Sequence, residues 1–80
     1  MTYLEIGHEP KEVPLNGRLS LEEAQKMVGG WVEVLYLRAG KIMLINEEGR
    51  PMNLPLNPLA TIVAGRVIVG NAIICDNCEF

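Results

Sequence analysis

The sequence has few aromatic residues, little histidine or cysteine, and no long apolar run. One tryptophan, two tyrosines and one phenylalanine stand among 80 residues, so the core must consist mainly of branched aliphatic side chains, which favour strands. No apolar stretch reaches the roughly 18 residues that span a bilayer, and no membrane contact is expected. The first 15 residues carry three glutamates and no basic start before an apolar run, so no signal peptide is expected there. A cytoplasmic protein is expected.

The chain also lacks any cluster of basic residues. Its seven lysines and arginines are scattered and never adjacent, and the net charge is −3. Binding to a nucleic-acid backbone requires clustered cations that displace counterions. A nucleic-acid partner is therefore not expected, although a local basic pocket remains open.

The length predicts a single domain over residues 1–80. Hydrophobic residues make up 49% and charged residues 21% of the sequence, a composition that folds. A domain this short buries only about 60–65% of its unfolded surface. Because small domains often gain stability by association, a homo-oligomer is expected.

Two helices are predicted from their capping residues. Ser20 followed by Glu23 is a capping box, and Gly29 can end that helix in a left-handed conformation. Asn57 is an N-cap before a proline, which predicts a short second helix over about Pro58–Val63. The apolar residues of the first helix share one face: Leu21, Ala24, Met27 and Val28.

The remaining apolar stretches predict about five strands. They are expected at residues 3–6, 11–15, 31–37, 41–46 and 66–76, with an edge position for 11–15 because of Pro14 and a bulge at Gly70. Ala39-Gly40 joins the third and fourth strands in a tight hairpin. Residues 31–37 are apolar on both faces, which predicts a central strand. The order predicts an α+β fold with a small mixed or antiparallel sheet, one main helix packed on it in two layers, and one short helix.

No catalytic signature is present, so an enzyme, a cofactor and a resident metal are not expected. Cys75 and Cys78 have the spacing of half a zinc site. The pair is interpreted as an ordinary chain end, with a zinc ion shared across a symmetric dimer left open. The adjacent Glu47 and Glu48 point to opposite faces of a strand, and His8 has no nearby nucleophile in the sequence.

The best candidate for a binding site is the segment Asn46–Asn57, called the crossover segment below. Asparagine amides both donate and accept hydrogen bonds, Arg50 can grip a phosphate or carboxylate, and prolines stiffen the loop. The alternative is structural: Asn57 only caps its helix, and Asn53 and Pro55 only shape the connection. The candidate ligand-binding residues are Trp31, Tyr36, Asn46, Glu48, Arg50, Asn53 and Asn57.

Four short motifs occur in a characteristic order, namely Gly29–Glu33, Leu44–Gly49, Leu54–Thr61 and Ile68–Ile74. This pattern over about residues 20–75 resembles a family of small phage and bacterial proteins known only as a domain of unknown function. The resemblance implies a phage or mobile-element setting and assigns no catalytic residue; Cys75–Cys78 lies outside the pattern.

The expected function is non-enzymatic. A phage-type protein would sequester a small ligand, a nucleotide-derived signal of host immunity, and so act against host defence. The alternative is an interaction module that inhibits a host enzyme through an acidic face formed by Glu9, Glu12, Glu22, Glu23, Glu47 and Glu48. A structural role in the phage is a third hypothesis.

Overall fold

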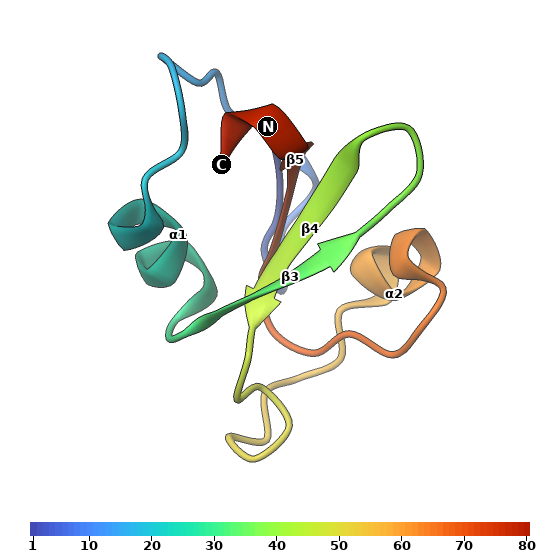
Figure 1. Ribbon diagram of the computed structural model, residues 1–80. Coiled ribbons are helices and arrows are strands. Elements are labelled where there is room, and N and C mark those ends of the chain that lie inside the picture. The colour runs from blue at the N-terminus through green and yellow to red at the C-terminus, as the bar shows by residue number, and fades with distance from the viewer.

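The computed structural model describes all 80 residues and contains one five-stranded antiparallel sheet (Figure 1). The strands are β1 (Thr2–Leu4), β2 (Lys11–Glu12), β3 (Val32–Tyr36), β4 (Lys41–Asn46) and β5 (Ala72–Asp76). The helices are α1 (Leu21–Val28), α2 (Pro58–Ala64) and a final 3₁₀ turn at Asn77–Glu79. The spatial order of the strands is β2-β1-β5-β4-β3. The predicted α+β class, the five strands and the two helices are confirmed.

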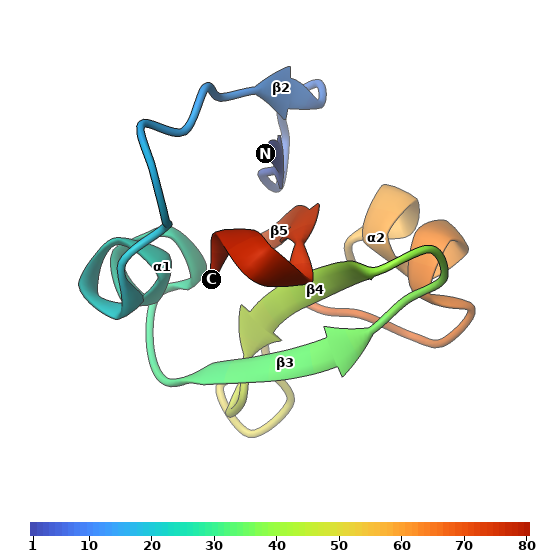
Figure 2. The same ribbon diagram turned by 45° about the horizontal axis from the view of Figure 1, so that its top comes forward.

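The two helices lie on opposite faces of the sheet, so the fold has three layers (Figure 2). We call these faces the α1 face and the α2 face. On the α1 face, Ala24 and Val28 pack against Ile42, Leu44, Ile73 and Cys75. On the α2 face, Ala60 packs with Leu4, Met43, Ile45, Ile68 and Ala72. The expected two-layer arrangement is therefore wrong, because the short second helix supplies a layer of its own.

The position of β3 also differs from the prediction. Residues 31–37 were expected at the centre of the sheet, but β3 is an edge strand and β5 is interior. Val32 and Val34 pack toward the α1 face, whereas Leu35 and Leu37 pack toward the α2 face. An edge strand between two helical layers needs apolar residues on both faces, and this explains the misleading pattern.

Helix α1 begins and ends as its sequence predicts. The Ser20 hydroxyl oxygen accepts a hydrogen bond from the Glu23 amide at 3.1 Å, and Gly29 adopts φ +83° after the last turn. The Glu23 carboxylate accepts from the Ser20 hydroxyl at 3.2 Å instead of reaching the cap amide. Leu21 was expected on the buried face but is 53% exposed. Leu19, one residue before the cap, is buried in the α1-face cluster in its place.

The last strand is shorter than predicted. Strand β5 covers only Ala72–Asp76, and Leu56 and Val69 form one isolated bridge before it. Gly70, with φ +80°, breaks the extended backbone. The Asn71 side chain then accepts from the Ile6 amide at 2.9 Å and donates to the Met27 carbonyl at 3.1 Å. The predicted irregularity at Gly70 is thus a complete bend that ties β1, α1 and β5 together.

Candidate functional site

The first predicted binding residue, Asn46, is buried and its polar atoms are occupied. Only 4% of the residue is exposed. Its Oδ1 accepts from the Glu48 amide at 2.8 Å, and its Nδ2 donates to the Val28 carbonyl at 3.2 Å. This side chain therefore anchors the turn after β4 to the end of α1.

Asn57 has a similar structural role at the start of α2. Its Oδ1 accepts from the Ala60 amide at 3.2 Å, which caps the helix. Its Nδ2 donates to two carbonyl oxygens, those of Leu4 and Gly70, each at 2.9 Å. Both amide protons are used inside the protein, so Asn57 has no donor left for a ligand. Asn57 therefore agrees with the structural alternative, in which its side chain serves the fold as a helix cap and not a ligand.

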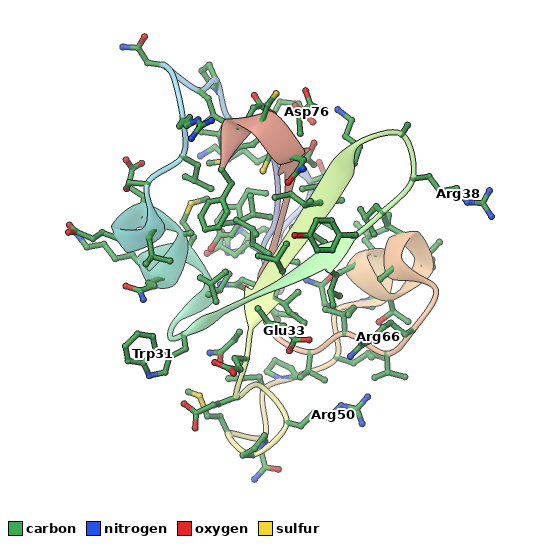
Figure 3. The ribbon with its side chains drawn as sticks, in the orientation of Figure 1. Trp31, Glu33, Arg38, Arg50, Arg66 and Asp76 are labelled. Carbon is green, nitrogen blue, oxygen red and sulfur yellow. The ribbon has the colours of Figure 1, made fainter.

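The remaining polar residues of the crossover segment are exposed. Glu48, Arg50 and Asn53 lie in the turn that follows β4, and Asn53 has φ +55°. Arg50 lines a hollow of about 160 Å³ together with Glu33 and Arg66, and all three side chains are labelled in Figure 3 below the end of the sheet. This volume is below the roughly 300–1,000 Å³ of small-molecule pockets.

The two aromatic candidates lie at opposite ends of the β3 region. Trp31 is 64% exposed and projects into solvent (Figure 3), and Tyr36 is 77% exposed. The structure therefore does not gather the seven predicted residues into one pocket. Of the seven, Tyr36 alone lines the largest hollow of the molecule.

That hollow, called the cleft below, has a volume of about 840 Å³ and opens beside α2. Helix α2 has only seven residues, and the cleft extends from it around the end of β5 to residues of the α1-face cluster such as Met1 and Cys75. Apolar side chains contribute much of the lining: Met1, Tyr36, Leu37, Ile62, Val63, Ala64, Ile74 and Cys75. The polar and charged lining residues are Thr2, Glu12, Arg38, Lys41 and Glu79. The cleft thus joins an apolar surface to a charged rim.

The charged rim contains one cation without a partner. Lys41 Nζ lies 2.6 Å from Asp76 Oδ1. The hydrogen bond to Asp76 and the charge of that carboxylate raise the pKa of Lys41 above its usual value. Arg38, by contrast, forms no ion pair and extends from the tip of the β3–β4 hairpin (Figure 3). Its guanidinium is therefore free to bind an anionic group.

The two cysteines differ in their surroundings. Cys75 belongs to the α1-face core, whereas Cys78 is exposed. Burial, followed by the negative charge of Glu79, raises the pKa of the Cys75 thiol. A buried, protonated thiol is a poor metal ligand and a poor nucleophile. No group of three metal-binding side chains is present in the chain, and neither helix has the length or apolar run to cross a membrane.

Sequence reasoning missed the cleft because it searched for polar residues. The signal that could have found it is the run from Pro58 to Ala64, a helix with no charged side chain. A helix that is apolar all round is usually buried, yet Ile62 is 76% and Val63 is 50% exposed. Exposed apolar side chains on a short helix of that composition indicate a surface that can bind an apolar group.

Comparison with known proteins places the chain in one family. The model of a family described as a domain of unknown function (DUF3846) matches residues 2–79. The chain therefore belongs to this family, and the expectation of a family known only in that way is confirmed. No curated protein and no solved structure matches the chain.

Proposed function

We propose that the protein is a non-enzymatic binding protein that holds a small amphipathic ligand, a nucleotide in the best-fitting case, in the cleft. One observation carries this proposal: a cleft of about 840 Å³ on a chain of only 80 residues. The volume falls within the range of small-molecule sites, which are mostly apolar with a few polar groups. The cleft has both kinds of surface.

The lining suggests how a nucleotide would lie. The base or sugar would pack on the apolar wall formed by Leu37, Ile62 and Val63, while Tyr36 borders the cleft from the α1 face of the strand end. The phosphate would be bound by the unpaired guanidinium of Arg38, which can donate two parallel hydrogen bonds to two phosphate oxygens. The rim carries Glu12 and Glu79 as well as Arg38 and Lys41, and Asp76 pairs with Lys41, so these side chains carry one more negative than positive charge. Such a site would favour one placed anionic group over a highly charged polyanion.

The chemistry of the lining supports binding without conversion. The Thr2 hydroxyl donates its hydrogen bond to Glu12, and the raised pKa of Cys75 keeps its thiol protonated. No histidine lines the cleft. Sequestration of a nucleotide-derived immune signal, the role expected from the phage resemblance, needs affinity and no catalytic group.

Another hollow is less suitable for an anionic ligand. It has about 400 Å³ and lies between the β1–β2 connection and the start of α2. His8 is its one potential cation, and its Nε2 lies 3.9 Å from the Glu5 carboxylate. The acidic-face alternative has weaker support, because its glutamates lie on three separate segments: residues 9–12, 22–23 and 47–48.

Thermal unfolding with a panel of linear and cyclic nucleotides tests the proposal. A ligand at 100 times its Kd stabilises a protein by about 2.7 kcal/mol, which raises the Tm of a domain this size by roughly 10 °C or more. Arg38→Ala should remove most of the shift, while the matched control Arg50→Ala should retain it. Mass spectrometry of the mixture should recover the nucleotide unchanged.

Three results would contradict the proposal. One is the absence of a Tm shift with every nucleotide in the panel. Another is loss of the shift in Arg50→Ala but not in Arg38→Ala, which would return the site to the crossover segment. The third is a chemically altered nucleotide, which would make the protein an enzyme.

A further inference from the structure

The outer edge of β3 carries backbone groups that have no partner in the sheet. Strand β3 pairs only with β4, in a register that sets Val34 opposite Leu44. At the ends of this pairing, the Leu37 amide donates to the Lys41 carbonyl at 2.9 Å and the Glu47 amide donates to the Trp31 carbonyl at 2.8 Å. The odd-numbered residues therefore bond to β4. Hydrogen-bond direction alternates along a strand, so the N–H and C=O groups of Val32, Val34 and Tyr36 point outward.

This edge lacks the features that usually prevent strands from pairing between molecules. Edge strands are commonly protected by proline, lysine, a bulge or very short length. The opposite edge, β2, has only two residues. Strand β3 has five residues, no proline, no lysine and no bulge, and Glu33 is its only charged residue.

We propose that β3 pairs with β3 of a second copy of this chain, antiparallel about a two-fold axis at Val34. In this register Val34 faces the partner's Val34, and Val32 faces the partner's Tyr36. All three outward-pointing residues then lie in hydrogen-bonded pairs, which gives six backbone hydrogen bonds across the axis. A shift by two residues along the strand would lose at least one of the three pairs within β3, so the symmetric register uses the edge most fully.

The same register gives both exposed aromatic residues a cross-strand neighbour. Tyr36, 77% exposed, would lie beside the partner's Val32 on the α1 face. Trp31, 64% exposed, would lie beside the partner's Leu37 on the α2 face. Aromatic and branched side chains opposite each other stabilise antiparallel pairs. The self-complementary placement argues for a second copy rather than an unrelated partner.

The pairing also changes the cleft, and this step rests on the proposed function. Leu37 lines the cleft from the end of the β3 region. With the partner's Trp31 beside Leu37, an indole ring would stand at the edge of each cleft. The partner's Trp31 would thus offer the ring of a bound nucleotide a stacking surface that one chain lacks.

One charged residue opposes the dimer. Glu33 would face the partner's Leu35. The two Glu33 residues would then be diagonal neighbours, with their Cα atoms about 7–8 Å apart. Arg50 and Arg66 line the same hollow as Glu33 and offset part of this repulsion. Neutralising Glu33 should therefore tighten the dimer. Because paired five-residue strands bury less surface than a standard interface, we expect micromolar rather than nanomolar association.

Sedimentation over a concentration series tests the interface, with the emission of the single tryptophan as a second readout. The wild-type protein should dimerise as concentration rises, and its Trp31 emission should shift to shorter wavelength. Val34→Pro should abolish both effects, because proline removes an N–H group that would donate to the partner strand. The fold itself should survive, since proline is tolerated on an edge where the N–H faces outward. Glu33→Gln should lower the dimer Kd several-fold. A monomer at every concentration, or a dimer unaffected by both variants, would overturn the proposal.

Disulfide trapping tests the register without relying on a proline variant. In a Cys78→Ser background, Glu33→Cys and Leu35→Cys chains are oxidised separately and as a mixture. A non-hydrogen-bonded antiparallel pair places Cα atoms about 4.5 Å apart, within the range of disulfides. Only the mixture should give a covalent dimer. A covalent dimer in either single sample, or none in the mixture, would refute the register.

These tests are separate from those of nucleotide binding. If the dimer forms but no nucleotide binds, the interface stands and the proposed function fails. If nucleotides bind to a protein that stays monomeric, the proposed function stands and the interface fails. A Trp31→Ala chain that still dimerises and binds nucleotides with wild-type affinity would refute the contribution of the partner's Trp31 to the cleft.

Discussion

Replacement of Asn57 should destabilise the fold through three separate hydrogen bonds. The side chain caps α2 through the Ala60 amide and donates to the carbonyls of Leu4 and Gly70. Asn57→Ala removes all three and leaves two buried carbonyl oxygens without this donor. Loss of the cap costs about 1 kcal/mol. Each deprived carbonyl costs about 1 kcal/mol, near the low end for buried polar groups, which gives about 3 kcal/mol in total.

Two further substitutions at Asn57 separate these contributions. Asn57→Ser keeps an oxygen for the cap but loses both donors, so we expect a loss of about 2 kcal/mol. Asn57→Asp also keeps the cap but directs a carboxylate at two carbonyl oxygens. It should therefore be at least as destabilising as Asn57→Ala at neutral pH, with part of its stability recovered when the carboxylate is protonated.

Urea unfolding measures these differences. At an m value of about 1 kcal/mol/M, the alanine variant should unfold at a midpoint lower by roughly 3 M. Asn53→Gly is the matched control, because Asn53 is exposed and glycine readily adopts its φ of +55°; its midpoint should change little. A loss below about 1 kcal/mol for Asn57→Ala, or equal stability of the aspartate variant and wild type, would refute the three-bond account.

Three other predictions concern stability at single sites. The raised pKa of Cys75 means that folding favours its thiol form, so the stability present below the ordinary pKa of 9.0 should fall as the pH rises above 9.0. In Cys75→Ala, the urea midpoint should decline less steeply over that pH range than in the wild type. An equal slope in the two proteins would contradict the assignment. Ala39 has φ +58° in the β3–β4 turn, so Ala39→Asn should raise the unfolding free energy by about 0.5–1 kcal/mol in calorimetry, and a loss would show that the turn tolerates alanine without strain. Gly70→Ala combines φ +80° with a Cβ only 2.7 Å from Leu54 Cδ1, so thermal unfolding should show a loss of about 2 kcal/mol or more; unchanged stability would mean that the bend relaxes freely.

The local features of the fold could be predicted because each depends on neighbouring residues. Ser20 and Asn57 mark helix starts by their side-chain oxygens, and Gly29 marks a helix end by its conformational freedom. The pairing across Ala39-Gly40 follows from a short connection between two apolar strands. In each case the deciding interaction lies within a few positions in the sequence.

Strand order could not be predicted, since it depends on contacts between distant segments. The apolar pattern of β3 is the same for a central strand and for an edge strand covered by helices on both faces. Only the pairing of β5 with both β1 and β4 decides between them. Single-sequence patterns carry no signal for that choice.

The candidate site was predicted less well than the fold. Asn46 and Asn57 have the same hydrogen-bonding groups whether they bind a ligand or their own backbone. Their burial, which the sequence does not reveal, leaves their amide protons inside the protein. Tyr36 does reach the cleft, but Arg38 was not among the candidates, because the predicted site was centred on the crossover segment.

The most direct test of the central claim is a nuclear magnetic resonance titration of the isotopically labelled protein with the nucleotide that gives the largest Tm shift. Binding in the cleft predicts that the amide resonances of Leu37–Lys41 and Ile62–Gly65 move together and saturate. Resonances that move only within the crossover segment, or none that move at all, would contradict the account.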